Sequence, residues 1–367
     1  MTSRLATLRA QLDARGLDGL LITQPENRRY LSGFTGSSGV LLVTSERTLI
    51  VTDSRYYEQV GREAPQCELV RQTGRQPEAI GALLERLDLR RVGIEAEAVS
   101  VADYSRWQAA APATVEWVPT EGLVSGLRAI KDEAELELIR RAQAIADAGY
   151  ERLLTIVQPG KSEKQVAWEF EVALRELGAD GLAFPLIVAS GPNAALPHYR
   201  TGQRIIGENE IVLVDFGARV AGYHSDCTRT LFTGDPATDT EFVRIYALGL
   251  EALETAEAGI RAGLRNQAAD ALAREVIAAA GRGDDFGHSL GHGIGLAVHE
   301  APLISYRADE GEVIPAGSVI TIEPGIYRPG WGGVRIEDLA VVREDGVDVL
   351  VRAGKDIDAW RRANQGG

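Results

Sequence analysis

The sequence predicts an α/β domain over residues 1–125, followed by an α+β domain over residues 126–367. Three observations lead to this prediction. Short apolar runs alternate with helical patterns in the first third of the chain, as in α/β folds. The later part contains long amphipathic helical patterns and strand pairs joined by glycine-containing turns. Between the two lies Pro119–Gly126, which has the proline, glycine and serine content of a linker.

The first domain begins with a helical pattern in which Leu5, Leu8 and Leu12 share one face. Apolar runs then predict strands at residues 19–23, 39–44, 48–52, 91–94 and 114–118. Helical patterns at residues 79–87 and 101–111 separate the later strands. This alternation predicts an α/β domain.

The second domain opens with a long amphipathic helix from Lys131 that ends before Pro159 and Gly160. Further helices are expected at residues 163–177, 239–258 and 266–280. Strands are expected at residues 184–189, 211–217, 223–232, 319–326 and 334–342. The domain therefore consists of two halves, each with helices and a hairpin.

Composition excludes several classes of protein. The chain carries 39 Lys and Arg against 53 Asp and Glu, a net charge of −14, and it has no basic block. This argues against nucleic acid or an anionic membrane as the main partner. No stretch reaches the roughly 18 apolar residues that span a bilayer. Two cysteines provide no disulfide framework, so we expect a cytoplasmic protein.

Two aspartates stand where strands are expected to be apolar. Asp215 interrupts the run 211–217, which is typical of a strand buried on both faces. A lone carboxylate there is disfavoured unless it is paired or binds a metal. The next strand carries Asp226. If the hairpin turn is centred between residues 220 and 221, the two aspartates face each other with Cβ atoms roughly 5 Å apart.

Two glutamates repeat this arrangement near the C-terminus. Glu323 interrupts an apolar strand, and Glu337 follows across a turn centred on Gly330, so the two can face each other. Tyr327 and Arg335 share the faces of these glutamates. Ion pairing with arginines such as Arg335 is one explanation for carboxylates in apolar strands, but it accounts for one or two of the four acids. A site for two divalent metal ions is the favoured interpretation.

All five histidines fall in one part of the chain: His198, His224, His288, His292 and His299. Three of them lie in the glycine-rich stretch 286–300, whose glycines would allow close turns around a ligand. His198 is equally compatible with a turn and with a site. His224 has the opposite parity to Asp226 and is treated as peripheral, and Cys227 points to the other face and is excluded as a ligand.

This ordered set resembles the metal ligands of the "pita-bread" metallopeptidases, which comprise methionine aminopeptidases, proline-specific aminopeptidases and dipeptidases, and metal-free creatinases. The motifs that carry the resemblance are VDFGARVAGYHSDCTRT, GHSLGHGIGLAVHE, TIEPGIY and GVRIEDLAVV. Residues 1–125 look like the N-terminal domain of the proline peptidases and creatinases. The resemblance implies a creatinase-type α/β domain and a catalytic domain with a curved antiparallel sheet.

The resemblance also implies roles for individual residues. The implied metal ligands are Asp215, Asp226, His292, Glu323 and Glu337. Glu323 would in addition move protons, with His198 and His299 also implied to be catalytic. Substrate would contact His198, His288, His299, Tyr327 and Arg335, although His288 could equally support a neighbouring group. The oxygen-rich ligand set favours two Mn²⁺ ions, with Co²⁺ or Zn²⁺ possible.

The leading hypothesis is an Xaa-Pro aminopeptidase that acts on short peptides with proline at the second position. The alternative is an Xaa-Pro dipeptidase, which would need a group that captures the free carboxylate; Arg28, Arg29 and Arg55 are candidates. A methionine aminopeptidase and a metal-free binding module are the less favoured options. Family resemblance further implies a homodimer.

Overall fold

The computed structural model describes residues 2–365, and the chain divides into two compact units between Arg128 and Ala129. The predicted domain boundary after residue 125 stays a prediction. Each unit is described by itself below. No helix in the described part of the chain is long and apolar enough to cross a membrane.

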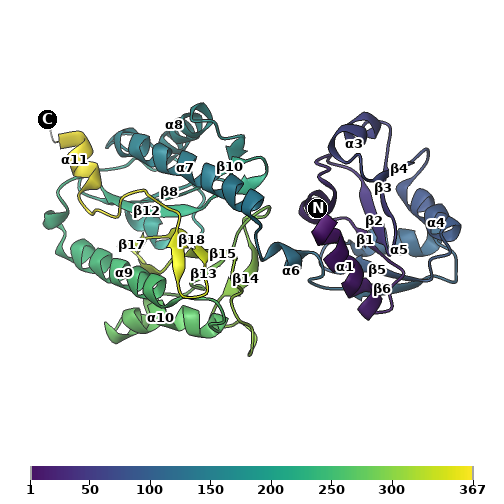
Figure 1. Cartoon of the computed structure of the whole chain (residues 1–367). Helices are drawn as coiled ribbons and strands as arrows, with labels where there is room; N and C mark the ends of the chain where they lie inside the picture. The colour runs from purple at the N-terminus through teal and green to yellow at the C-terminus, as the bar shows by residue number, and fades with distance from the viewer. Residues whose placement is uncertain (1, 366–367) are drawn as a thin grey trace. The chain divides into compact units, whose positions relative to one another are not determined.

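The N-terminal unit contains a six-stranded mixed sheet with the order β4-β3-β2-β1-β5-β6 (Figure 1). The strands are β1 (Gly19–Ile22), β2 (Val40–Thr44), β3 (Thr48–Thr52), β4 (Glu68–Arg71), β5 (Arg91–Glu95) and β6 (Glu116–Thr120). The helices are α1 (Thr2–Ala14), α2 (Pro25–Ser32), α3 (Tyr57–Glu63), α4 (Gln76–Arg86), α5 (Val101–Ala110) and α6 (Ser125–Arg128). The predicted α/β architecture is present.

The predicted linker at residues 119–126 is only partly present, since residues 121–124 lie outside helices and strands and α6 begins at Ser125. Pro119 and Thr120 extend β6, where they pair with Ile94 and Glu95 of β5. A proline is tolerated there because β6 is an edge strand. Sequence analysis also missed β4, whose charged and half-exposed residues lie at the other edge of the sheet.

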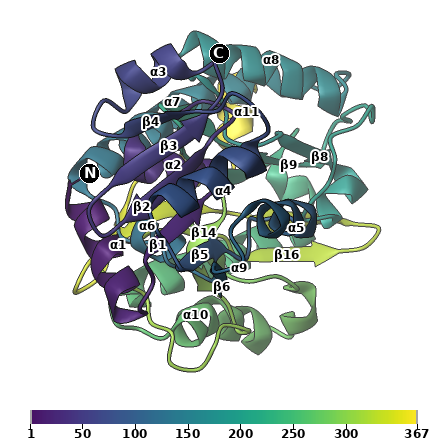
Figure 2. The ribbon, with the colours of Figure 1, turned by 90° about the vertical axis from the view of Figure 1, so that its right-hand side faces the viewer.

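The C-terminal unit places its strands between two pairs of helices. α7 (Glu133–Ile156) and α8 (Glu163–Glu176) run along one side, and α9 (Thr240–Gly259) and α10 (Asn266–Ala279) along the other (Figure 1). The view turned by 90° again shows α7 and α8 together, with α10 on the opposite side (Figure 2). Both α7 and α8 begin with a capping box, which satisfies the free N–H groups of the first turn. The chain ends with α11 (Ala359–Gln365).

The strands of this unit form several small sheets. The first half contains β7 (Gly181–Leu182), β8 (Ile187–Ser190), β9 (Ile211–Phe216), β10 (Ala218–Val220), β11 (Tyr223–His224) and β12 (Cys227–Phe232). The second half contains β13 (Gly291–Gly293), β14 (Glu300–Ile304), β15 (Val319–Ile322), β16 (Gly325–Arg328), β17 (Gly332–Arg335), β18 (Asp338–Val342) and β19 (Val347–Val349). The sheet orders are β11-β10-β7, β12-β9-β8, β14-β13-β15-β18-β19 and β16-β17.

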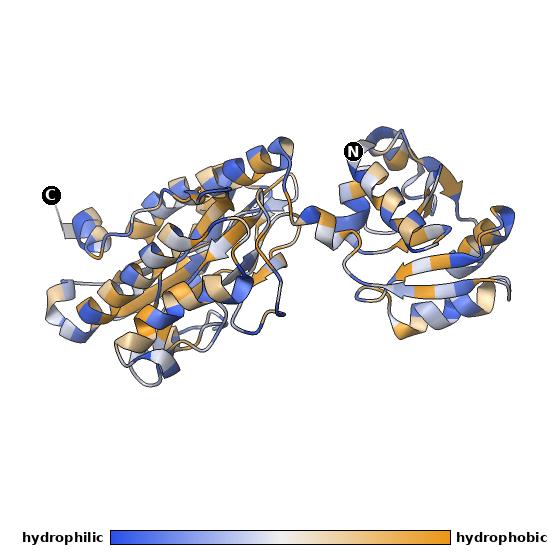
Figure 3. Ribbon diagram, turned by 60° about the horizontal axis from the view of Figure 1, so that its bottom comes forward, coloured by the Kyte–Doolittle hydropathy of each residue, from blue (hydrophilic) through white to orange (hydrophobic). Residues whose placement is uncertain are grey.

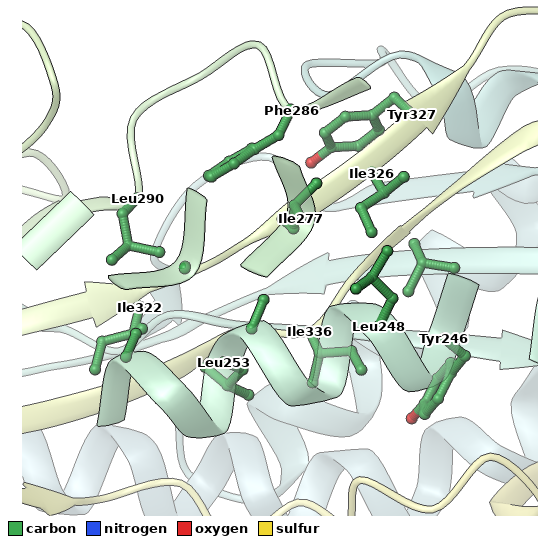
Figure 4. Packing of buried hydrophobic residues seen from close by; sticks show 14 of the residues in the cluster. Tyr246, Leu248, Leu253, Ile277, Phe286, Leu290, Ile322, Ile326, Tyr327 and Ile336 are labelled. Carbon is green, nitrogen blue, oxygen red and sulfur yellow. The ribbon is translucent and has the colours of Figure 1, made fainter. Parts of the chain in front are cut away.

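Burial of apolar side chains between α9, α10 and the strands forms the main core. Strands in this unit are mostly apolar, whereas helices alternate between apolar and polar residues (Figure 3). Ile322 and Ile336 contribute from the strand side, and Leu248 and Leu253 from α9 (Figure 4). This core fixes the strands from which the carboxylates project.

Three predicted strands are each divided in two. The predicted strand 211–217 is present as β9, which ends before Gly217, and β10 follows it. The predicted strand 223–232 breaks at Ser225 and Asp226. The later runs break before Gly325 and after Arg335. Gly217 is needed at its break because a Cβ there would lie 2.0 Å from the carbonyl oxygen of Ser225. Asp226, Glu323 and Glu337 lie at interruptions, whereas Asp215 lies within β9.

The register of the first hairpin differs from the prediction. Thr228, not Asp226, lies opposite Asp215. The turn consists of Ala221 and Gly222, both with positive φ (45° and 78°), which moves its centre by one residue. Asp226 therefore lies diagonal to Asp215 on the same side of the strands.

The register of the second hairpin agrees with the prediction. Gly325 pairs with Arg335 in one ladder and Ile322 pairs with Asp338 in the other, so Glu323 and Glu337 face each other in the gap between them. Gly330 lies at the turn with φ 81°.

Candidate metal centre

Three of the predicted carboxylates converge to a single point. Asp215, Asp226 and Glu337 each offer an oxygen, and these oxygens lie within 4.8 Å of one another. The exposed fractions of Asp226 and Glu337 are 5% and 2%. One carboxylate oxygen of Asp215, Oδ1, is buried without a hydrogen-bond partner. A buried acceptor in this position fits a cation better than any group of the protein.

Electrostatics lead to the same conclusion. Burial and the mutual repulsion of the acids raise the pKa of Asp226 and Glu337 well above their ordinary values. Burial likewise raises the pKa of Asp215, although Arg335 opposes this effect. Carboxylates in this state are held ionised only by added positive charge, and oxygen donors suit hard divalent cations. The donor set therefore fits divalent metal.

His292 on β13 presents its Nε2 atom to the same cluster. Its Nδ1–H donates to the carbonyl oxygen of Gly293 over 3.0 Å, which leaves the lone pair on Nε2. Nε2 lies 3.8 Å from an oxygen of Asp226 and 3.5 Å from one of Glu323. Burial lowers the pKa of His292 to about 3, so the ring is neutral and available as a metal ligand.

Glu323 lies just after the end of β15 and completes the predicted set. Its backbone N–H donates to the carbonyl oxygen of Leu290 over 2.8 Å, and Thr321 donates to its carboxylate over 3.3 Å. Burial raises the pKa of Glu323 to about 8, with a contribution from Asp215. A carboxyl group with that pKa can both accept and return a proton near neutral pH.

Arg335 connects the cluster to the surrounding strands. It donates to Asp215 over 2.6 Å, to the hydroxyl of Thr228 over 3.0 Å and to the hydroxyl of Tyr327 over 2.8 Å. Thr228 in turn donates to Glu337 over 2.6 Å. Ion pairing with arginine thus accounts for one of the acids. Arg229 pairs outside the cluster, with Asp338.

His288 lies behind this network. Its Nδ1–H donates to the carbonyl oxygen of Ser289 over 2.8 Å, and its Nε2 accepts from Tyr327 over 2.9 Å. Burial lowers the pKa of His288 to about 4, so the ring is neutral. With both ring nitrogens engaged, the geometry favours the supporting role that sequence analysis left open.

A cavity of about 1150 Å³ opens onto the cluster. Nine of the ten predicted site residues line it: His198, Asp215, Asp226, His288, His292, His299, Glu323, Arg335 and Glu337. Tyr327 does not line the cavity and contacts the site through Arg335 and His288. The ring of His299 lies 4.2 Å from that of His292. The structure therefore brings together the residues that were selected from the sequence.

The glycines of residues 286–300 act differently from the prediction. Gly291 and Gly293 belong to β13, and a Cβ on either would lie 2.0 Å and 2.1 Å from the carbonyl oxygens of Thr321 and Ala301. They allow neighbouring strands to approach closely rather than wrapping a ligand. Two other expectations agree with the structure, since neither Cys227 nor His224 lines the cavity.

Thr228 is the residue that sequence reasoning missed. It is fully buried and bonded to Glu337 and Arg335, so it orients both side chains. A correct register for the first hairpin would have placed Thr228 opposite Asp215 and so have revealed it.

Two family descriptions match the chain. Residues 4–130 match the Creatinase/Prolidase N-terminal domain, and residues 137–344 match Metallopeptidase family M24. An Xaa-Pro dipeptidase of Pyrococcus furiosus is 34% identical over 97% of this chain and 100% of its own length.

Solved structures agree in both fold and extent. An Xaa-Pro dipeptidase from Bacillus anthracis superposes with a TM-score of 0.93 at 40% identity, covering 97% of this chain and 99% of its own. An X-Pro aminopeptidase from Thermotoga maritima gives a TM-score of 0.88 at 34% identity, covering 96% and 98%.

Proposed function

The chain belongs to metallopeptidase family M24, and from this premise we propose that it is an Xaa-Pro dipeptidase. The cluster of four carboxylates and one neutral imidazole on a single cavity supports metal-dependent hydrolysis. Relatives described as Xaa-Pro dipeptidases favour this alternative over the aminopeptidase that led the sequence hypotheses. An Xaa-Pro aminopeptidase is the second candidate because the similar Thermotoga maritima structure is described as an X-Pro aminopeptidase.

The metal-binding residues in this proposal are Asp215, Asp226, His292, Glu323 and Glu337. We propose two divalent ions, with Mn²⁺ first and Co²⁺ or Zn²⁺ as alternatives, because oxygen donors dominate the set. Bound ions of this kind lower the pKa of a coordinated water and polarise a carbonyl group.

The protein's own groups carry out the proton transfers in this proposal. Glu323 takes a proton from the attacking water and delivers it to the proline nitrogen of the leaving product. His299 and His198 line the same cavity and can donate hydrogen bonds to the carbonyl oxygen as negative charge develops there. We therefore expect Glu323→Gln to lower kcat by at least about 10³-fold at full metal occupancy, measured with Ala-Pro.

A dipeptidase also needs a partner for the substrate's carboxylate, and Arg307 is our candidate. Arg307 and Arg335 are the two arginines that line the cavity. Arg335 is committed to Asp215 and its other partners, whereas no carboxylate of the described residues pairs with Arg307. Two arginines suggested from the sequence are used within the N-terminal unit, since Arg28 donates to Gly39 and Arg55 pairs with Asp53.

Four substrates compared on the Mn²⁺-loaded protein test this proposal: Ala-Pro, Ala-Pro-amide, Ala-Pro-Ala and Met-Ala. We expect Ala-Pro to be the best substrate. Loss of one charge-assisted hydrogen bond should lower kcat/KM for the amide by about 10- to 100-fold. Faster cleavage of Ala-Pro-Ala than of Ala-Pro would identify an aminopeptidase instead, and cleavage of Met-Ala alone would identify a methionine aminopeptidase.

The variant Arg307→Ala tests the carboxylate partner separately. It should raise KM for Ala-Pro by about 10- to 100-fold and leave KM for Ala-Pro-amide unchanged. An equal effect on both substrates would exclude Arg307 as the carboxylate partner. A cytoplasmic location, a homodimer and an accessory N-terminal domain of residues 1–125 beside a catalytic domain of residues 126–367 complete the proposal.

A further inference from the structure

His299 reaches the cavity without an anchor of its own. Its ring contacts that of His292, but its side chain makes no hydrogen bond to any other part of residues 2–365. The position of this imidazole must therefore come from the backbone of residues 294–299, which connects β13 to β14, and from Glu300 at the start of β14.

Several contacts hold this connection in place. The carbonyl oxygen of Gly295 accepts from the backbone N–H of His224 over 3.0 Å and lies 3.0 Å from its Nδ1 atom. The backbone N–H of Ile294 donates to Val319 over 3.1 Å. These contacts fix the beginning of the connection. At the other end, Glu300 follows His299 and pairs with Gly293 at the start of β14.

A buried ion pair fixes the side chain of Glu300 as well. Lys131 Nζ lies 2.7 Å from Oε1 of Glu300, the residue after His299, and the two side chains are 1% and 3% exposed. Lys131 also donates to the carbonyl oxygen of Ala129 over 3.3 Å. Separating the two groups would leave each charge buried and uncompensated, which would strongly destabilise the folded protein. The ion pair therefore holds the Glu300 side chain in one position.

The connection is shaped to admit the ion pair. A Cβ on Gly295 would lie 2.5 Å from Oε1 of Glu300 and 3.1 Å from Cε of Lys131. The glycine thus allows the two charged groups to pack directly against the backbone that His224 holds from the other side. The start and end of the connection are thereby joined to one another.

We propose that Lys131 is a positioning residue for His299, acting through its ion pair with Glu300. The inference rests on the proposed function only for the part that His299 plays in hydrolysis. Displacing a catalytic group by about 1 Å can cost 10²-fold in rate. We therefore expect Lys131→Met to lower kcat for Ala-Pro by about 10- to 100-fold, with KM changed less than threefold.

Hydrogen exchange of the metal-free protein tests the attachment without any substrate. Peptides that cover residues 294–302 should exchange at least about tenfold faster in Lys131→Met than in the wild type, while peptides from residues 211–216 stay unchanged. This measurement keeps its meaning even if the protein hydrolyses no Xaa-Pro substrate, so a failure of the proposed function is distinguishable from a failure of this inference.

Three further variants separate positioning from folding. The double variant Lys131→Met with Glu300→Gln removes both charges and should regain stability but not kcat. Gly295→Ala keeps both charges yet displaces them, and it should lower kcat in the same way. Leu253→Ala, a fully buried core position, is the matched control that should lower the melting temperature with unchanged kcat per folded molecule. Wild-type kcat in the folded double variant, or unchanged exchange at residues 294–302 in Lys131→Met, would overturn the inference.

Discussion

Chelation should make the stability of the C-terminal unit fall as the pH rises. Without metal, burial raises the pKa of Glu323 from 4.5 to about 8. A carboxyl group with a higher pKa in the folded state binds its proton more tightly there, so stability is lost as the pH rises from 4.5 to about 8. The shift corresponds to about 5 kcal/mol. Asp226 and Glu337 shift in the same direction and add to this loss.

Bound metal should abolish this loss, because a cation keeps the same carboxylates ionised. The difference in melting temperature between Mn²⁺-loaded and chelated protein should therefore widen between pH 5 and pH 8. Three pH units correspond to about 4 kcal/mol, so at about 2–4 °C per kcal/mol for a unit of this size the added difference is about 8–16 °C. Scanning calorimetry at half-unit pH steps measures it.

The control for this experiment is Glu323→Gln, whose amide does not titrate. Its chelated form should lose much of the pH dependence between pH 5 and pH 8. Comparing metal-loaded with chelated wild type cancels the contributions of other titrating groups, such as Glu257, because these groups are present in both forms. Melting temperatures that run parallel in the two metal states across this range would refute the account of the cluster.

Two further predictions concern the packing around the site. Thr228→Val removes one buried hydrogen bond from Glu337 and one from Arg335, so it should cost about 2–4 kcal/mol of unfolding free energy. It should also weaken Mn²⁺ binding about 10- to 100-fold, and urea denaturation and calorimetric titration measure the two effects. Unchanged metal affinity would contradict this assignment. Gly291→Ala places a methyl group 2.0 Å from a carbonyl oxygen of β15 and should lower the free energy of unfolding by about 3 kcal/mol. Gly287→Ala is the control, because its methyl group meets nothing within 4 Å and should change that free energy by less than about 0.5 kcal/mol. Equal effects of the two variants would contradict the close approach of β13 to β15.

The sequence was sufficient for the family resemblance and the fold class, both of which are confirmed. It was also sufficient for the second hairpin, because a glycine at the centre of the turn, Gly330, marks the register. The predicted register of the first hairpin is wrong because Ala221 adopts a positive φ, which an alanine in the sequence does not indicate. That error concealed Thr228 as the partner of Asp215.

Other features depend on contacts between distant segments. His292 was expected in a loop, yet β13 forms because Gly291 and Gly293 permit close approach to β14 and β15. A three-residue strand with two glycines has no alternation that a pattern could detect. The ion pair of Lys131 with Glu300 joins residues that are far apart in sequence, and local patterns carry no information about it.

The breaks in the strands explain how an apolar sheet can hold so many acids. At Glu323 and Glu337 the hairpin ladders are interrupted, and each backbone N–H turns instead to another segment, donating to Leu290 over 2.8 Å and to Thr228 over 3.1 Å. These bonds satisfy the backbone and at the same time tie the second hairpin to β13 and to the first hairpin. The carboxylates consequently meet at a junction between sheets, where side chains from both hairpins can face one point. An uninterrupted hairpin would have paired these residues only with each other, so the interruptions are what turn two acidic hairpins into one site.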